Sequence, residues 1–213
     1  KHPLLFPRKF NRYLEPFLGS GAVYFYLSPK NSILSDINGD LIATYQGIKS
    51  DYENVVSELL VHQKKHSFDY YYAVRDYRPR LLCKRAARLI YLNRTCWNGL
   101  YRVNMNGDFN VPKGTKNSVI LKTDNFKETS KRLRGATLLN VDFEETINLA
   151  TSGDFVFVDP PYTVKHDFNG FVKYNEKMFS WNDQIRLSEA LSRARERGAK
   201  ILLTNADHVS VRE

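Results

Sequence analysis

Hydrophobic and polar residues follow one pattern at both ends of this chain and a different pattern in its middle. Near the ends, short apolar segments alternate with segments in which apolar residues have helical spacing. Strands are expected at residues 12–17, 32–36, 137–141, 155–158 and 200–204. Helices are expected between them, at residues 22–27, 38–49, 143–150 and 182–197. Alternation of this kind predicts an α/β fold with a mainly parallel sheet covered by helices.

The middle of the chain breaks this alternation. Residues 51–64, 66–76 and 80–95 have helical patterns, whereas residues 96–118 are rich in Asn and Gly and predict an ordered loop or hairpin. In the third helix Arg80, Lys84 and Arg88 should share a polar face. Its other face should be apolar and should hold Leu81, Leu82, Ala86, Leu89 and Ile90. We therefore expect residues 51–118 to form a small helical module, inserted between residues 1–50 and 119–213 of the α/β domain.

Composition excludes several classes of protein. With 213 residues and 42% hydrophobic residues, the chain can form one domain with a core and is not disordered. No apolar run approaches the roughly 18 residues of a membrane span, and the first residues lack the pattern of a signal peptide. Cys83 and Cys96 are too few for a disulfide framework, so we expect a cytoplasmic protein. His62 and His66 have no third ligand nearby in the sequence, so no metal is expected.

Charge is distributed unevenly along the chain. The net charge is +9, of which +3 falls in residues 1–50, +6 in residues 51–118 and none in residues 119–213. Between residues 75 and 102, eight basic residues accompany the single acidic residue Asp76. Such a concentration favours a polyanionic partner, although a solvated helix face would have the same composition.

A glycine-rich turn is the first candidate site. Gly19-Ser20-Gly21 lies between an expected strand and an expected helix, where backbone N–H groups can approach a ligand closely. Glu15 precedes the turn, and Asp36 ends the next strand, where a carboxylate can bind ribose hydroxyls. The pattern favours a ligand that contains a nucleoside, but a plain tight turn is an equally simple explanation of the glycines.

A second candidate site is Asp159-Pro160-Pro161-Tyr162, directly after the apolar strand 155–158. Ligands of open α/β sheets bind at the carboxyl ends of the strands. The prolines make the loop rigid, and its carbonyl groups can accept hydrogen bonds. Asp159 and the Pro160 carbonyl could accept from an exocyclic amine while Tyr162 stacks on a flat base. A rigid strand exit with a surface tyrosine is the alternative.

A third candidate is the segment 92–102, where Arg94, Trp97, Asn98, Tyr101 and Arg102 follow the basic helix. Arg and Asn side chains can recognise base edges, and aromatic side chains can insert into a base stack. A hydrogen-bonded loop that packs on its own aromatic residues is the alternative.

Together these motifs resemble the Dam-like (D12 class) adenine-N6-specific DNA methyltransferase family. The matching segments appear in the family's order, at residues 15–21, 35–38, 91–94, 97–100, 107–112 and 159–162. The resemblance implies a Rossmann-like sheet with an inserted DNA-recognition domain and S-adenosylmethionine as cofactor, with S-adenosylhomocysteine as product.

The resemblance also assigns residues to roles. The implied cofactor-binding residues are Lys1, Glu15, Pro16, Phe17, Gly19, Ser20, Gly21, Asp36, Ile37, Asp142, Phe143 and Asp159. The implied catalytic residues are Asp159, Pro160, Pro161 and Tyr162. The implied DNA-binding residues are Arg94, Trp97, Asn98, Leu100, Arg102, Pro112 and Lys113.

The expected function is transfer of a methyl group to N6 of an adenine flipped out of duplex DNA, in a GATC-like site and in a restriction–modification or solitary role. The expected partner is double-stranded DNA in a bacterial or phage-infected cell, with the protein acting as a monomer. Methylation of RNA or of a protein amide nitrogen, or loss of activity in a DNA-binding relative, are the alternatives. Because the family's first motif precedes Lys1 and further strands usually follow residue 205, we expect this chain to be a fragment.

Overall fold

The computed structural model describes residues 5–104, 107–162 and 179–208. Its five strands form one parallel sheet in the order β3-β2-β1-β4-β5. The strands are β1 (Tyr13–Glu15), β2 (Ser32–Ser35), β3 (Ala136–Leu139), β4 (Phe155–Val158) and β5 (Lys200–Leu203). The expected α/β class and all five expected strands are therefore confirmed.

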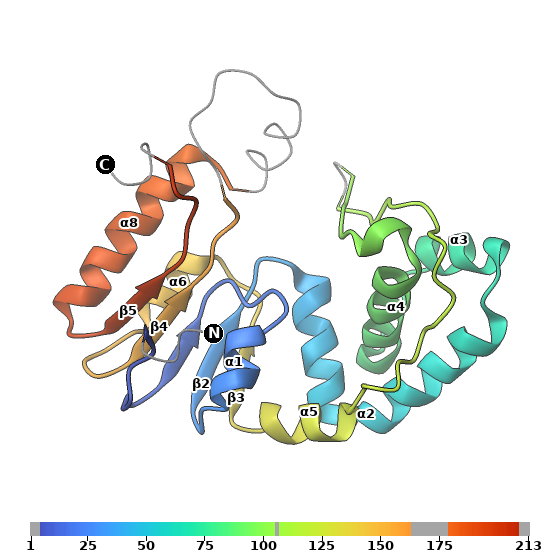
Figure 1. Ribbon diagram of the computed structural model, residues 1–213, viewed down its shortest axis with the longest axis horizontal. Coiled ribbons are helices and arrows are strands. Elements are labelled where there is room, and N and C mark those ends of the chain that lie inside the picture. Colours follow the sequence, from blue (N-terminus) through green and yellow to red (C-terminus); the bar gives the residue numbers. More distant parts are fainter. Residues whose placement is uncertain (1–4, 105–106, 163–178, 209–213) are drawn as a thin grey trace. The chain divides into compact units, whose positions relative to one another are not determined.

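The helices also follow the expected order (Figure 1). They are α1 (Ala22–Leu27), α2 (Gly39–Lys65), α3 (Phe68–Asp76), α4 (Leu82–Thr95), α5 (Phe126–Leu133), α6 (Phe143–Asn148) and α8 (Trp181–Glu196), with a 3₁₀ turn η2 (Trp97–Gly99). The expected helices 38–49 and 51–64 are the two parts of α2, which is interrupted at Asp51 by a non-helical backbone conformation. Helix α5 was not predicted.

The two faces of the sheet carry different side chains, because successive residues of a strand point to opposite faces. Leu14 and Val156 belong to the core that includes Phe143 of α6 and Leu187 of α8. Tyr13 instead lies against the rings of Tyr24 in α1 and Phe155 in β4. Glu15, two residues after Tyr13, shares the α1 face of β1.

The chain divides into two compact units, which are described separately. Unit 1 comprises residues 1–37 and 135–213 and contains the sheet. Unit 2 comprises residues 38–134 and is built on the packing of α2 against α4 and α5. Unit 2 thus extends beyond the expected module 51–118 at both ends, because it includes all of α2 and α5.

The expected faces of α4 need a correction. Arg88 was placed on the polar face, but it is only 5% exposed. Its guanidinium donates hydrogen bonds to the carbonyl groups of Val74 and Arg75 near the end of α3, which compensates its burial. Leu81, expected on the apolar face, precedes the helix and is exposed.

Candidate active site and nucleic-acid interface

Three carboxylates lie at or just beyond the carboxyl ends of three adjacent strands. Glu15 is the last residue of β1, Asp36 follows β2, and Asp159 follows β4. Parallel strands end at the same edge of a sheet, so unit 1 presents these three groups along one edge. The segments 15–21, 36–38 and 159–162 contain no Lys or Arg. Such an edge favours a ligand with hydroxyl groups and positive charge over a polyphosphate.

Glu15 is the most deeply buried of the three, with 3% of its surface exposed. The hydroxyl of Tyr13 donates a hydrogen bond to its Oε2 over 2.8 Å, and the backbone N–H of Tyr24 donates another. Burial is the main reason why the pKa of Glu15 is raised to about 8, and the negative charge of Asp159 adds to the effect, whereas the two hydrogen bonds oppose it.

The glycine turn between β1 and α1 adopts the conformation that its sequence favours. Gly19 and Gly21 have φ of 45° and 64°, in the left-handed region that L side chains rarely adopt. The N–H of Gly19 donates to Asp36 Oδ2 over 3.0 Å, which joins the turn to the loop after β2. A Cβ added at Gly19 would meet nothing within 4 Å, so the backbone here is accessible to a ligand. Ser20 is exposed beside it.

The loop after β2 is held from the side of β3. Asn140 donates hydrogen bonds to the carbonyl groups of Asp36 and Ile37 over 2.9 and 3.0 Å. The N–H of Asp36 donates to the carbonyl of Leu139. Ile37 is 67% exposed, so it offers an apolar surface next to Asp36.

Asp142 and Phe143 begin α6. Asp142 caps the helix by accepting from the N–H of Glu144, and it forms an ion pair of 2.8 Å with Arg186. Phe143 is 5% exposed and stacks on Phe17, with ring centroids 5.3 Å apart. The structure therefore gives Phe17 and Phe143 a packing role beneath the strand ends, and Pro16 is buried beside them.

The loop after β4 exposes Asp159 and Tyr162 and buries Pro160. Thr204, directly after β5, donates from its hydroxyl to Asp159 Oδ1 over 2.5 Å. The N–H of Thr204 also donates to the carbonyl of Val158, so the pairing of β5 with β4 fixes this contact. Tyr162 is 53% exposed and Pro161 is exposed before it. Lys1 lies outside the described residues.

A hairpin in unit 2 carries the expected DNA-binding residues other than Arg94, which lies in α4. Cys96 pairs with Lys113 and Val103 with Phe109 in antiparallel bridges, and the N–H of Trp97 donates to the Pro112 carbonyl. The expected hairpin within 96–118 is thus confirmed. The expected DNA-binding residues on it that are exposed are Trp97, Asn98, Leu100, Arg102 and Pro112.

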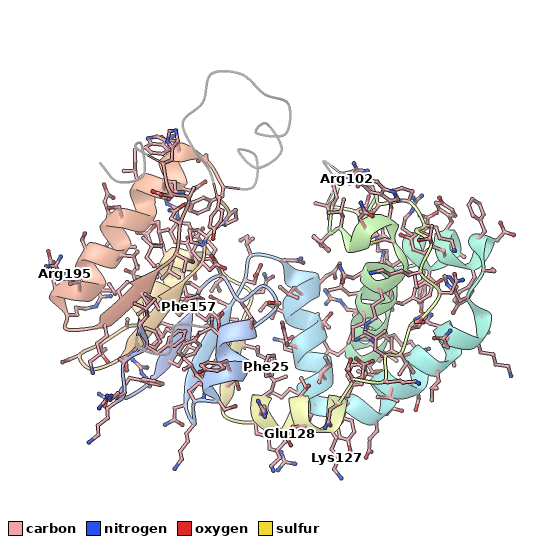
Figure 2. The ribbon with its side chains drawn as sticks, viewed as in Figure 1. Phe25, Arg102, Lys127, Glu128, Phe157 and Arg195 are labelled. Atoms are coloured by element: carbon pink, nitrogen blue, oxygen red, sulfur yellow. The ribbon has the colours of Figure 1, made fainter. Side chains whose placement is uncertain are left out.

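Internal contacts give this hairpin a defined shape. Asn98 and Gly99 have positive φ values of 54° and 65°, and the side chain of Asn93 donates to the Gly99 carbonyl. Arg102, labelled in Figure 2, donates to Asn110 Oδ1 over 2.8 Å. Lys113 donates to the Gly114 carbonyl. The exposed aromatic, amide and guanidinium groups are therefore presented by an ordered segment.

Arg94 has a different environment from the other expected DNA-binding residues. Its guanidinium makes two hydrogen bonds with the carboxylate of Asp124, at 2.6 and 2.8 Å, and a third with the Val119 carbonyl. These contacts join α4 to the segment before α5 within unit 2, and a contact of Arg94 with DNA stays a prediction.

Several contacting residues were missed by sequence reasoning. Tyr13, Asn140 and Thr204 each hold one of the strand-end segments, but none stands within a motif. The contact of Tyr13 with Glu15 could have been expected, because residues two apart in a strand lie on the same face. Among the described residues, no group of three His, Cys, Asp or Glu side chains is arranged to hold a metal, and no helix is long and apolar enough to span a membrane.

Comparison with known proteins adds the family. Residues 4–213 match the family described as D12 class N6 adenine-specific DNA methyltransferase. The Type II methyltransferase M.MjaIII of Methanocaldococcus jannaschii is 40% identical over 93% of this chain and 74% of its own length. The Type II methyltransferase M1.LlaDCHI of Lactococcus lactis subsp. cremoris is 36% identical over 95% of this chain and 74% of its own length.

A third relative carries a different name but the same type of activity. The DNA adenine methylase of Haemophilus influenzae is 31% identical over 98% of this chain and 75% of its own length. The family match covers nearly the whole chain, and the parallel sheet with carboxylates at its strand ends agrees with it. The chain belongs to the D12 class of N6 adenine-specific DNA methyltransferases.

Proposed function

We propose that this chain methylates the exocyclic N6 of adenine in double-stranded DNA, and that unit 1 carries out the chemistry while unit 2 recognises the DNA. The observation that carries the proposal is the Asp159-Pro160-Pro161-Tyr162 segment at the end of β4, next to two further strand-end carboxylates. Methyltransferases of this family use S-adenosylmethionine as methyl donor.

The residues at the sheet edge fit this donor. The donor has ribose hydroxyls and positive charges on its sulfonium and ammonium groups, which match an edge of carboxylates without Lys or Arg. We assign Asp36 to the ribose hydroxyls, Ile37 to the adenine ring and Glu15 to the cationic part. Backbone groups of the turn 19–21 complete the binding surface, since no side chain blocks it at Gly19. Phe17, Phe143, Pro16 and Asp142 support this surface from below.

The target amine is a poor nucleophile because its lone pair is delocalised into the purine ring. When bound, S-adenosylmethionine would supply the methyl group: the N6–methyl bond would form as the sulfur–methyl bond breaks, S-adenosylhomocysteine would leave, and the amine would lose one proton to the solvent. Asp159 and the Pro160 carbonyl accept hydrogen bonds from the N6 amine and favour a pyramidal nitrogen. The hydrogen bond from Thr204 holds the Asp159 carboxylate in one orientation. Alignment and preorganised electrostatics therefore provide the catalysis.

The adenine must leave the duplex to reach these groups. We assign Tyr162 to stacking on the extruded base, because its ring is 53% exposed directly after the two prolines. In unit 2, Trp97, Asn98, Leu100 and Arg102 are proposed to contact bases around the target, with Pro112 and Lys113 beside them. We propose a GATC-like recognition site.

The test is methylation by the wild-type protein and by Asp159→Ala with a tritium-labelled methyl donor. The substrates are duplex DNA, single-stranded RNA and a protein mixture. We expect label in DNA only, and a loss of about a hundredfold or more in kcat for Asp159→Ala, because the variant lacks an acceptor for the amine. Asp76→Ala is the matched control, since this carboxylate is exposed at the end of α3 in unit 2. Digestion of the product with methylation-sensitive nucleases identifies the site.

Near-wild-type methylation by Asp159→Ala would contradict the assignment of Asp159. Label in RNA or protein rather than in DNA would contradict the proposed substrate. Binding of DNA without any methylation by the wild type would favour the inactive relative.

A further inference from the structure

Glu15 is a buried acid that has no cationic partner among the residues the structure describes. Its carboxyl group lies on the α1 face of β1, where Tyr13 donates to it over 2.8 Å and the N–H of Tyr24 donates as well. No Lys, Arg or His among the described residues forms an ion pair with it. An ionised carboxylate in such surroundings is costly unless a positive charge is brought to it.

The groups that face Glu15 from the neighbouring elements do not supply that charge. On β4, Asp159 lies beyond the strand and its negative charge disfavours a second one. On β2, the residue paired with Glu15 is the apolar Leu34. On α1, the contact is the uncharged amide of Tyr24. On its own strand, Tyr13 is fully buried, and burial followed by the charge of Glu15 raises the pKa of its hydroxyl, so Tyr13 remains a neutral donor.

We propose that Glu15 holds a proton in the free protein and releases it when the cationic methyl donor binds, with Tyr13 as the residue that positions the carboxyl group. This inference rests on the proposed function, because it takes the methyl donor as the ligand of the sheet edge. The O–H bond of Glu15 breaks, its proton goes to the solvent, and the resulting carboxylate is balanced by the positive charge of the ligand. The Tyr13 hydroxyl donates to the carboxyl group in both states.

The pKa of about 8 agrees with this geometry. A group with that pKa is about nine-tenths protonated at pH 7. An opposite charge within a few ångströms lowers a carboxyl pKa by about 1–3 units, which ionises at least about half of it at pH 7. Because binding releases a proton, affinity for the donor rises with pH between the pKa of Glu15 in the complex and pH 8, by up to about tenfold per pH unit. Above pH 8 the free protein is already ionised, and the dependence disappears.

The test is calorimetric titration of the wild-type protein with S-adenosylmethionine in two buffers of different ionisation enthalpy, at pH 7 and pH 9. The difference in heat gives the number of protons released. We expect between about 0.4 and 0.9 proton per bound ligand at pH 7 and little at pH 9. In Glu15→Gln, whose amide has no proton to release, the pH 7 value should fall by that amount.

A second variant tests the role of Tyr13. In Tyr13→Phe the hydrogen bond that favours the ionised carboxyl is lost, so the pH at which proton release declines should move upward. A residue that acted only through packing would lower affinity without moving this profile. Circular dichroism of both variants checks that the fold is retained.

The outcomes separate the inference from the proposed function. Tight binding with no proton release by the wild type at pH 7 would overturn the inference and leave the proposed function intact. Equal release by wild type and Glu15→Gln would also overturn it, because the proton would then come from another group. Absence of binding by the folded wild type would contradict the proposed function itself.

Discussion

Glu15 makes the stability of the free protein depend on pH in an unusual direction. Its pKa is raised from an ordinary value of 4.5 to about 8, chiefly by burial, so between these values the folded state binds more protons than the unfolded state. The free energy of unfolding should therefore fall as the pH rises through this window. The expected slope from this one residue is on the order of 1 kcal/mol per pH unit.

Urea unfolding without ligand at pH 5.5, 6.5 and 7.5 measures this effect. The free energy of unfolding of Glu15→Gln should not show this decrease. It should therefore rise relative to that of the wild type as the pH rises. The buried Asp154 is a useful internal contrast, since burial raises its pKa but the hydrogen bonds from Arg12 and Thr151 outweigh this and lower it. The contribution of Asp154 to the free energy of unfolding is lost only in acid, below the pH range in which Glu15 acts. Parallel curves for wild type and Glu15→Gln would refute the prediction.

Thr204 is expected to act on the rate through Asp159. Replacing Thr204 by Val keeps the shape of the side chain and removes the hydroxyl that donates to Asp159 Oδ1. We expect kcat to fall by about tenfold with little change in the affinities for donor and DNA, because the carboxylate loses its fixed orientation. Steady-state kinetics on a duplex measures it, and Thr204→Ser should restore the rate. If the Ser and Val variants behave alike, Thr204 has no positioning role.

At the residue scale, the sequence predicted the groups that stand in motifs but not their partners. Glu15 and Asp36 were selected because they flank the glycine turn and end the next strand, and Asp159 because it follows an apolar strand. Thr204 could not be assigned to Asp159, because the contact depends on the register of β5 against β4. Arg88 was misplaced for a related reason: the carbonyl groups that surround its guanidinium come from α3, and no pattern within α4 reveals them.

Unit 2 is held together mainly by the close packing of α2 on α4. A Cβ at Gly47 would lie 2.9 Å from both the Leu82 carbonyl oxygen and the Ala86 Cβ. Gly47→Val should therefore push the helices apart and lower the free energy of unfolding by about 2 kcal/mol. The matched control is Ser57→Val on the exposed side of α2, which should cost less than about 1 kcal/mol. Thermal or urea unfolding compares them, and equal costs would show that the approach at Gly47 is not restrictive.

At the element scale, most of the fold was predictable because the apolar patterns at both chain ends are long and regular. Helix α5 was not, because only Phe126 and Leu133 among its eight residues are apolar, and they lie at its two ends. The one local indication was Asn125, whose side chain accepts from the N–H of Glu128 and caps the helix. Unit 2 begins at Asn38 rather than at residue 51, because α2 continues through the bend at Asp51, which looks like the end of a helix in the sequence.

For the whole molecule, the division into units shows where the net charge is located. Unit 2 contains 18 basic and 9 acidic residues, and unit 1 contains 14 of each, so the entire +9 belongs to unit 2. The sequence had placed only +6 in the expected module 51–118. The additional residues come mainly from α5 and its flanking segments; Lys127 and Glu128 of this helix are labelled in Figure 2.

DNA binding should accordingly depend steeply on salt. Neutralising phosphates with basic residues releases counterions, so we expect affinity for a duplex to fall by about a hundredfold between 50 and 200 mM salt. Binding of the methyl donor, measured in the same buffers, should change far less because unit 1 is neutral. Fluorescence anisotropy with a labelled duplex gives the slope. Equal salt dependence of the two ligands would contradict the assignment of the charge to DNA binding.

The confinement of charge to one unit also affects how the protein first meets DNA. A protein with evenly distributed positive charge is only attracted by the electric field of a duplex. A protein that is charged in one part and neutral in another also experiences a torque that orients it. During diffusion, residues 38–134 should therefore be drawn to the phosphates first, and the neutral unit should follow. Encounters would then begin in the orientation that recognition requires, and fewer of them would be lost to contacts made through the unit that carries Asp159.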